Sequence, residues 1–249
     1  MKKSNTLFLL TLSFLLVSFF STDNCFAQTK KTTTKPNILF IVSDDTGYGD
    51  LGPYGGGVGR GMPTPNIDKM AKSGMKFYSF YAQPSCTPGR AAIQTGRIPN
   101  RSGMTTVAFQ GQGGGLPAAE WTLASVLKKG GYKTYFTGKW HLGESDYALP
   151  NAQGYDVMEH AFLYHCNAYT YGDSTWFPDM DPKLRKMFWN ITKGSLSGKA
   201  GEKPREDFKV NGQYVDTPTI NGKEGIVGIP FMDKYVEQSG IAFLEDAAK

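Results

Sequence analysis

Three short clusters in the sequence combine residue types that carry chemistry. The first is Asp44 and Asp45, two adjacent carboxylates that directly follow an apolar run. Adjacent carboxylates repel each other unless a cation offsets their charge, and their oxygen atoms suit Ca²⁺ or, as an alternative, Mg²⁺. The pair therefore predicts a metal site, and a turn capped by acidic residues is the structural alternative.

The second cluster places a cysteine directly before a predicted helix. Pro88 is typical of a first helical turn, and Cys86 lies just ahead of it. A cysteine at that place lies in the positive field of the helix, which favours a reactive thiol. Arg90 follows four residues after the cysteine and can fold back beside it. The alternative is a structural cysteine in a disulfide with Cys166.

The third cluster holds two basic side chains in the sequence Gly-Lys-Trp-His-Leu-Gly, residues 138–143. Lys139 and His141 are two residues apart, so at the end of an extended strand their side chains would face the same way. Two cationic groups on one face fit an anionic, oxygen-rich ligand. A loop histidine without chemical function is the alternative.

The elements that must position these clusters alternate between strands and helices. The apolar run at 37–43 predicts a strand buried on both faces, and 75–82 and 132–136 predict two more. Helices are predicted at 65–73, 88–95, 121–129 and 231–248. Such alternation is typical of an α/β fold with a mainly parallel sheet flanked by helices, in which ligands bind beyond the carboxyl ends of strands. Residues 150–230 show weak periodicity and predict an excursion on the substrate side, with a hairpin.

The amino-terminal segment predicts export. Lys2 and Lys3 precede an apolar stretch at 7–20, which is short for a membrane-spanning helix, and small residues before Ala27 suit cleavage there. We therefore expect a signal peptide at 1–27, a mature region at 28–249, and a periplasmic or secreted protein that is not integral to the membrane after cleavage. An uncleaved anchor is the alternative. The 249 residues carry a net charge of +5 without a basic block, which argues against a nucleic-acid partner.

The three clusters together are far more specific than each alone. From Lys35 to Gly143, their order and spacing resemble the type I sulfatase family, whose fold is alkaline-phosphatase-like. The pairing of Cys-x-Pro-x-Arg with Gly-Lys-Trp-His-Leu-Gly carries most of this resemblance. The resemblance implies that Cys86 is oxidised by a maturation enzyme to formylglycine, whose hydrate attacks the sulfur of a sulfate ester. Cys86 would then be unable to pair with Cys166.

The resemblance also assigns roles to the other residues. Asp44 and Asp45 would hold Ca²⁺ together with the modified cysteine. Arg90 would hold the formylglycine hydrate in place. Lys139 would bind a sulfate oxygen, and His141 would bind the formylglycine hydroxyl and assist its deprotonation.

Two departures from the family pattern affect these expectations. Gly89 stands where the family most often has Ser or Ala, and the Cys-x-Pro-x-Arg motif is nevertheless intact. The family also carries a further histidine, a metal-binding Asp-Asn or Asp-His pair and a second lysine downstream of a helix like the one at 231–248. His160 and His165 do not match that histidine's context. We therefore expect 28–249 to be the amino-terminal part of a catalytic domain, truncated at its carboxyl end and with little activity alone.

The expected activity is hydrolysis of sulfate esters in sulfated small molecules or sulfated carbohydrates. A phosphodiesterase or phosphonate hydrolase of the same superfamily is one alternative. A non-catalytic remnant that binds anions or sulfated glycans is the other.

Overall fold

The computed structural model describes residues 35–109, 111–164, 179–184, 196–206, 209–210, 213–214, 219–220, 223–224 and 232–249. The chain divides into two compact units, residues 1–46 and 47–249, which are described separately below. The predicted signal peptide, His165 and Cys166 lie outside the described residues. Within the described part of the chain, no helix is both long enough and apolar enough to cross a membrane.

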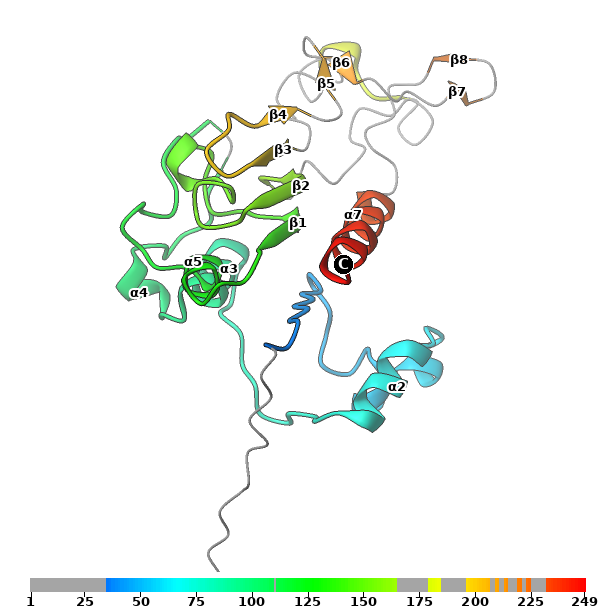
Figure 1. The fold of residues 1–249 in the computed structure, drawn as a ribbon. Helices are drawn as coiled ribbons and strands as arrows, with labels where there is room; N and C mark the ends of the chain where they lie inside the picture. The colour runs from blue at the N-terminus through cyan, green and yellow to red at the C-terminus, as the bar shows by residue number, and fades with distance from the viewer. Residues whose placement is uncertain are drawn as a thin grey trace, which may run out of the picture. The chain divides into compact units, whose positions relative to one another are not determined.

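In the second unit, short helices come first along the chain, most of the strands follow, and the helix α7 comes last (Figure 1). Its elements in chain order are η1 (Gly52–Tyr54), η2 (Gly57–Arg60), α2 (Pro65–Ser73), α3 (Cys86–Thr95), α4 (Pro99–Ser102), α5 (Leu123–Lys129), β1 (Tyr135–Lys139), η3 (Asp146–Ala148), β2 (Val157–Phe162), β3 (Leu196–Lys199), β4 (Arg205–Glu206), β5 (Lys209–Val210), β6 (Gln213–Tyr214), β7 (Thr219–Ile220), β8 (Lys223–Glu224) and α7 (Met232–Ala247).

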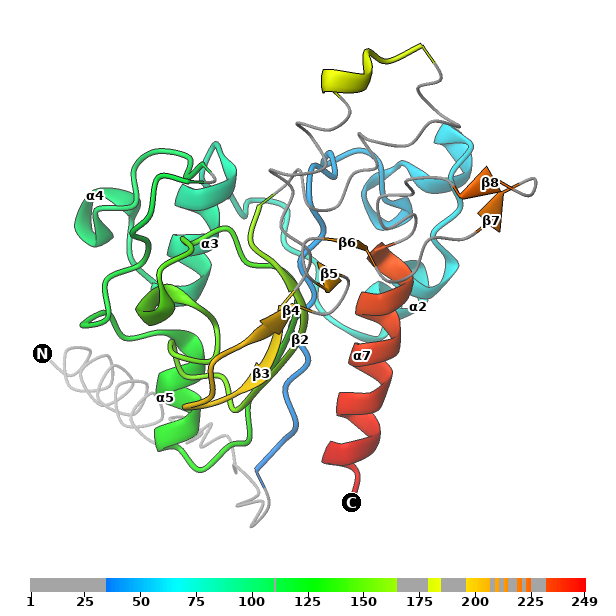
Figure 2. The same ribbon diagram turned by 90° about the horizontal axis from the view of Figure 1, so that it is seen from above.

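The main sheet has four strands in the order β1-β2-β3-β4. The β1–β2 pair is parallel, whereas β2–β3 and β3–β4 are antiparallel. Helix α7 packs against β1 and β2, and α3 and α5 lie on the other face of the sheet (Figures 1 and 2). The α/β class is therefore confirmed, and the sheet within the described residues is mixed.

The hydrophobic core lies between the sheet and helices α3 and α5. Its largest buried side chain is Trp140, which is 1% exposed, and Leu116 and Leu142 are completely buried beside it. The rings of Phe136 and Tyr155 contact Trp140 edge-on, at centroid distances of 5.2 and 6.1 Å. Because a close-packed core leaves little freedom to its members, the chain from β1 to Leu142 is held firmly in place.

The predicted helices are confirmed, with small shifts at their ends. Helix α3 begins at Cys86, two residues earlier than predicted, because a proline is tolerated throughout the first turn, where backbone N–H groups have no partner in the helix. Helix α5 begins after Thr122, which forms a reciprocal capping box with Ser125.

Two of the three predicted strands are wrong within the described structure. Residues 37–43 and 75–82 form no strand, and their apolar side chains are exposed, from 44% for Val42 to 89% for Tyr81. An apolar run shows only that a segment favours burial, whereas a strand also requires a neighbour that completes its hydrogen-bond ladder. No strand of the described residues pairs with either segment.

The third predicted strand forms, but it begins at Tyr135 instead of residue 132. The end of α5 explains this shift, because residues 130–132 form the turn that ends the helix. Gly131 has a φ of 79°, and the N–H of Tyr132 donates to the carbonyl of Leu127 at 3.1 Å, as in a Schellman motif. The strand ends at Lys139, three residues beyond the predicted end at 136.

Asp156 joins β1, β2 and α5 at the start of the parallel pair. Its carboxylate accepts hydrogen bonds from the backbone N–H of Thr134 at 3.0 Å and from the Thr134 hydroxyl at 3.1 Å, and it forms an ion pair with Lys128 at 2.5 Å. Burial raises the pKa of Asp156, but these donors together outweigh burial and hold the pKa below its usual value.

We therefore expect Asp156→Asn to lower the free energy of unfolding by about 1 kcal/mol at pH 7. Because the folded-state pKa is depressed, this contribution is present above the unfolded-state pKa of about 4 and is lost as the pH falls through the folded value. Urea unfolding of the wild type and the variant at a series of pH values below 7 measures it, and the difference between them should shrink as the pH falls below about 4. Asp146→Asn, at an exposed position, is the control, and a pH-independent difference would contradict the prediction.

Candidate active site

Helix α3 presents Cys86 as its first residue. The preceding residue, Ser85, is extended, with φ −150° and ψ 168°, so the chain turns sharply into the helix at the cysteine. The Cys86 thiol is half-buried and free. The helix ends at Gly96, whose left-handed φ of 65° lets its N–H bond back to Ala92.

Lys139 approaches Cys86 from the carboxyl end of β1. Its ammonium Nζ lies 3.3 Å from the Cys86 Sγ, and the lysine is only 7% exposed. The two residues are 53 positions apart in the sequence, so the placement of β1 beside helix α3 creates this contact. The structure therefore brings together two of the predicted site residues, a nucleophile candidate and a buried cation.

Arg90 fastens the same strand end to the same helix. One of its guanidinium nitrogens, Nη1, donates a hydrogen bond to the backbone carbonyl of Lys139. This contact carries positive charge toward the site and at the same time fixes the backbone from which the Lys139 side chain extends. The sequence predicted that Arg90 folds back beside Cys86. In the structure, Arg90 hydrogen-bonds to the backbone of Lys139, the residue whose side chain contacts Cys86.

His141 belongs to the same cluster through hydrogen bonds with two other segments. Its ring Nε2 lies 2.9 Å from the backbone carbonyl of Ala108, and its own carbonyl accepts from the Thr87 hydroxyl at 2.9 Å. The ring is 4% exposed and meets the Tyr164 ring edge-on at 5.6 Å. Cys86, Arg90, Lys139 and His141 are therefore all placed by α3 and the end of β1.

The backbone at His141 differs from the prediction. We expected an extended strand end with Lys139 and His141 facing the same way, but His141 has a left-handed φ of 56°. Strain of this kind costs on the order of 1–2 kcal/mol and persists only where the surroundings enforce it. The buried neighbours Trp140 and Leu142, together with the two hydrogen bonds of His141, provide that constraint.

The two glycines that bracket this segment are required by its geometry. Gly138 has a φ of 93° at a β-bulge, where the register with β2 shifts. A Cβ on Gly143 would lie 2.2 Å from the Cα of Gly115, with which Gly143 forms an isolated bridge. These glycines, the two buried apolar residues and the two basic residues account for every position of 138–143.

Tyr155 links the core below the site to helix α3. Its hydroxyl donates to the side-chain oxygen of Gln94 at 3.0 Å. Burial raises the pKa of Tyr155 to about 12. The tyrosine therefore remains a neutral donor that holds α3 against the sheet.

Asp44 and Asp45 belong to the first unit, so their place in the site remains a prediction. Asp45 has a left-handed φ of 54°. The donor chemistry of the pair fits Ca²⁺, which prefers carboxylate oxygens but takes six to eight ligands. Among the described residues no group of three or more His, Cys, Asp or Glu side chains could hold a metal ion. Two carboxylates thus account for only part of a calcium site.

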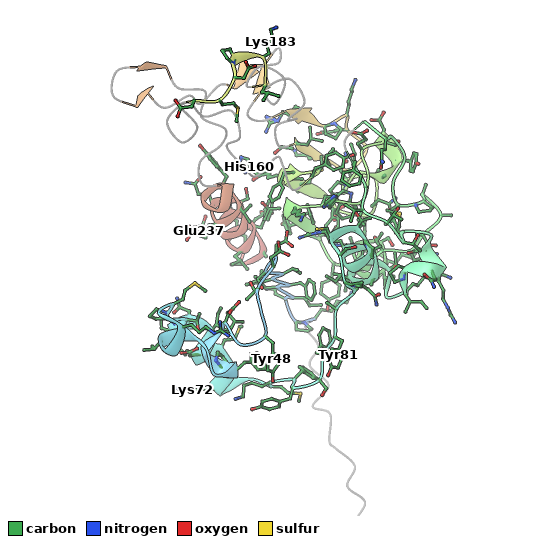
Figure 3. The ribbon with its side chains drawn as sticks, turned by 180° about the vertical axis from the view of Figure 1, so that it is seen from behind. Tyr48, Lys72, Tyr81, His160, Lys183 and Glu237 are labelled. Atoms are coloured by element: carbon green, nitrogen blue, oxygen red, sulfur yellow. The ribbon has the colours of Figure 1, made fainter. Side chains whose placement is uncertain are left out.

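His160 serves another element of the fold. Its Nδ1 lies 2.7 Å from the hydroxyl of Ser239 in α7, and its ring lies near Tyr235, with the centroids 5.4 Å apart (Figure 3). The residue also occupies a bulge of β2, with a φ of 48°. These contacts join α7 to the sheet.

Sequence reasoning missed two members of the site, Thr87 and Ala108. Thr87 lies between the cysteine and the proline of the second cluster, so its proximity to Cys86 was available as a signal. Ala108 acts only through its backbone N–H and carbonyl, which every residue type except proline has in common. No residue pattern could have identified it.

A family model described as Sulfatase matches residues 36–209, which is more than half of the chain and includes every predicted site residue. The chain belongs to the sulfatase family. Similar curated proteins include human arylsulfatase A, with 48% identity over 132 residues, and rat N-acetylgalactosamine-6-sulfatase, with 44% over 130. These alignments cover 51% and 49% of the chain, and it spans about a quarter of each relative, 25% and 24%.

Solved structures give the same family. The PsFucS1 sulfatase from Pseudoalteromonas sp. superposes with a TM-score of 0.72 at 33% sequence identity, over 86% of this chain and 41% of that one. Ps i-CgsB superposes with a TM-score of 0.56 at 31% identity, over 73% and 39%. The predicted alkaline-phosphatase-like fold is therefore confirmed for this member of the family.

Gly89 stands where the sulfatase motif most often has Ser or Ala, and the effect of this difference on stability can be tested. It lies inside α3, where a Cβ would meet Gln83 only at ordinary contact distances of 3.7 and 4.0 Å. We expect Gly89→Ala to raise the free energy of unfolding by about 0.5–1 kcal/mol, because alanine loses less backbone entropy in a helix. Urea unfolding measures this. Gly96→Ala is the matched control and should destabilise, since its φ is 65°; destabilisation by Gly89→Ala would contradict the prediction.

Proposed function

We propose that the protein that carries this chain hydrolyses sulfate esters at Cys86, after a maturation enzyme converts this residue to formylglycine. The observation that carries the proposal is the contact between the Lys139 ammonium and the Cys86 Sγ at 3.3 Å, at the first residue of a helix. A buried cation beside the nucleophile position is what an anionic sulfate group requires. Membership of the sulfatase family supports the same reaction.

Lys139 would bind an oxygen of the sulfate group. A charge in a site that is only 7% exposed interacts more strongly than one in water, because less solvent screens it. The ammonium is also held in advance, by the β1 backbone and by the Arg90 hydrogen bond, so little reorganisation is needed when charge develops on the substrate. The burial of the Lys139 charge and its fixed position would be this chain's contribution to binding the transition state.

His141 would accept or return a proton near the same position. Its ring Nε2 faces a carbonyl oxygen, which can only accept a hydrogen bond, so the proton of the neutral ring lies on Nε2 and the basic lone pair on Nδ1. A histidine with a defined tautomer can act as a general base at near-neutral pH. This supports the predicted role of His141 in deprotonating the nucleophile.

The two absent groups would supply the remaining chemistry. A formylglycine hydrate supplies a hydroxyl nucleophile for the sulfur of the ester. A Ca²⁺ ion, with Mg²⁺ as the alternative, supplies a Lewis acid for sulfate oxygens, and Asp44, Asp45 and the modified Cys86 would be among its ligands.

The substrate is proposed only as a class, a sulfated small molecule or a sulfated carbohydrate. The relatives include enzymes named for N-acetylgalactosamine 6-sulfate, and Ps i-CgsB has been solved with a neocarrahexaose. We further propose a periplasmic or secreted protein, released by cleavage after Ala27. Amino-terminal sequencing of the mature protein tests that cleavage.

The decisive experiment combines mass spectrometry with paired assays. The protein is co-expressed with a formylglycine-generating enzyme, and the Cys86 peptide is analysed for the aldehyde. Turnover is then measured with an aryl sulfate and with the matching aryl phosphate, and Cys86→Ala is the control. Aldehyde formation with a preference for sulfate supports the proposal. A preference for phosphate would favour a phosphodiesterase, and sulfate binding without turnover would favour a non-catalytic anion-binding protein.

A further inference from the structure

Thr87 connects three segments that contribute to the candidate site: helix α3, the chain just after β1, and the loop that contains Ala108. It is the second residue of α3 and is completely buried. Its hydroxyl donates a hydrogen bond to the backbone carbonyl of His141 at 2.9 Å and accepts one from the backbone N–H of Ala108 at 3.0 Å. The side chain that follows Cys86 therefore bridges the end of β1 and the loop that contains Ala108.

Ala108 completes a closed arrangement around His141. Its N–H is bound by the Thr87 hydroxyl, and its carbonyl accepts from the His141 Nε2 at 2.9 Å. The Thr87 hydroxyl thus holds the His141 backbone directly and the His141 ring indirectly, through Ala108. Displacement of Ala108 would move the acceptor that orients the ring.

The ring orientation has a chemical consequence. As long as the Ala108 carbonyl faces Nε2, the neutral ring carries its proton there and its lone pair on Nδ1. If the carbonyl moved away, the two tautomers would become closer in free energy and the ring could rotate. His141 also has a left-handed backbone, with φ at 56°, which needs support from its neighbours.

We propose that Thr87 is a positioning residue, which fixes the tautomer and the orientation of His141 through its hydroxyl. The proposal deepens the function proposed above and rests on it for its catalytic meaning. The structural part, the link from the Thr87 hydroxyl to the His141 ring, does not depend on sulfatase activity.

Substitutions at residue 87 separate the hydroxyl from the shape of the side chain. Thr87→Val keeps the shape but removes both hydrogen bonds of the hydroxyl. Thr87→Ser keeps the hydroxyl and removes only a methyl group. Thr95→Val is the matched control, because Thr95 lies in the same helix and bonds only locally, to the Ala91 carbonyl at 2.7 Å and the Arg97 N–H at 3.2 Å.

The first measurement is the tautomer of His141 by long-range ¹H–¹⁵N NMR of the histidine-labelled protein, with formylglycine neither required nor present. The wild type, Thr87→Ser and Thr95→Val should show the Nε2–H form, and Thr87→Val should show averaging of the two tautomers. The wild type alone can overturn the proposal, if its ring carries the proton on Nδ1, and this holds even if Thr87→Val fails to fold. A fixed Nε2–H form in folded Thr87→Val would also overturn it.

The second measurement is steady-state kinetics of the converted protein with an aryl sulfate, normalised to aldehyde content. Thr87→Val should lower kcat by about 10- to 100-fold with little change in KM, because a small displacement of a catalytic group affects the reaction more than ground-state binding. Thr87→Ser should recover most of kcat. Absence of turnover in the wild-type protein that carries this chain would refute the proposed function and leave the NMR result intact. Equal kcat for Thr87→Val and Thr87→Ser would refute the positioning role alone.

Discussion

We expect Lys139→Met to lower kcat/KM for an aryl sulfate by about 100-fold or more, the usual effect of removing one electrostatic contact to developing charge. Methionine retains most of the buried aliphatic stem and removes only the ammonium that lies 3.3 Å from the Cys86 Sγ. The loss should therefore reflect charge and not packing. Steady-state kinetics provides the measurement, with the aldehyde content of the Cys86 peptide determined on the same samples.

The control for this result is Lys72→Met, an exposed lysine of α2 (Figure 3). It removes the same charge from the protein but not from the site, so kcat/KM should change by less than about twofold. Equal losses for the two variants would show that net charge, and not the local cation, attracts the substrate. Full activity of Lys139→Met at normal aldehyde content would contradict the proposed role.

Arg90→Ala is expected to lower kcat per aldehyde by about 100-fold, through displacement of the β1 end from which Lys139 extends. The variant loses the guanidinium hydrogen bond to the Lys139 carbonyl, so the free energy of unfolding should also fall by about 1 kcal/mol. Arg90→Lys retains the charge without the planar fork of donors and should have intermediate activity.

Arg97→Ala is the matched control for Arg90→Ala. Arg97 follows the same helix, and its Nη1 donates to both carboxylate oxygens of Glu120, at 2.8 and 2.9 Å. It is half exposed, so its loss should cost less than about 1 kcal/mol and leave kcat unchanged. Because Arg90 also belongs to the motif around the cysteine for which conversion is proposed, activity must be expressed per aldehyde. Normal kcat per aldehyde in Arg90→Ala would assign the arginine to maturation alone.

The helices were predictable because their signals are local. Proline at the first turn, glycine at the end and a spaced apolar face identify α2, α3, α5 and α7 within two residues at their starts. The strands were less predictable. The apolar runs at 37–43 and 75–82 suggested strands that the described structure does not contain, since a ladder depends on a partner that may be distant in sequence.

The residues that gather around the amino end of α3 and the end of β1 were predictable for a different reason. Cysteine, arginine, lysine and histidine were chosen by residue type and spacing, and all four lie at α3 and the end of β1. Their exact relationships were not predictable. The arginine holds the lysine's backbone, and His141 has a left-handed backbone in place of an extended one.

The sequence by itself therefore determined which side chains could act, the order of the helices and the family, because these depend on residue identity and local spacing. Only the tertiary structure decided which atoms meet. The Lys139–Cys86 contact spans 53 residues, and the bridge from Thr87 to His141 spans 54. Contacts of this length arise from the packing of α3 against the sheet, and the backbone groups of Ala108 that complete the site carry no signature in the sequence.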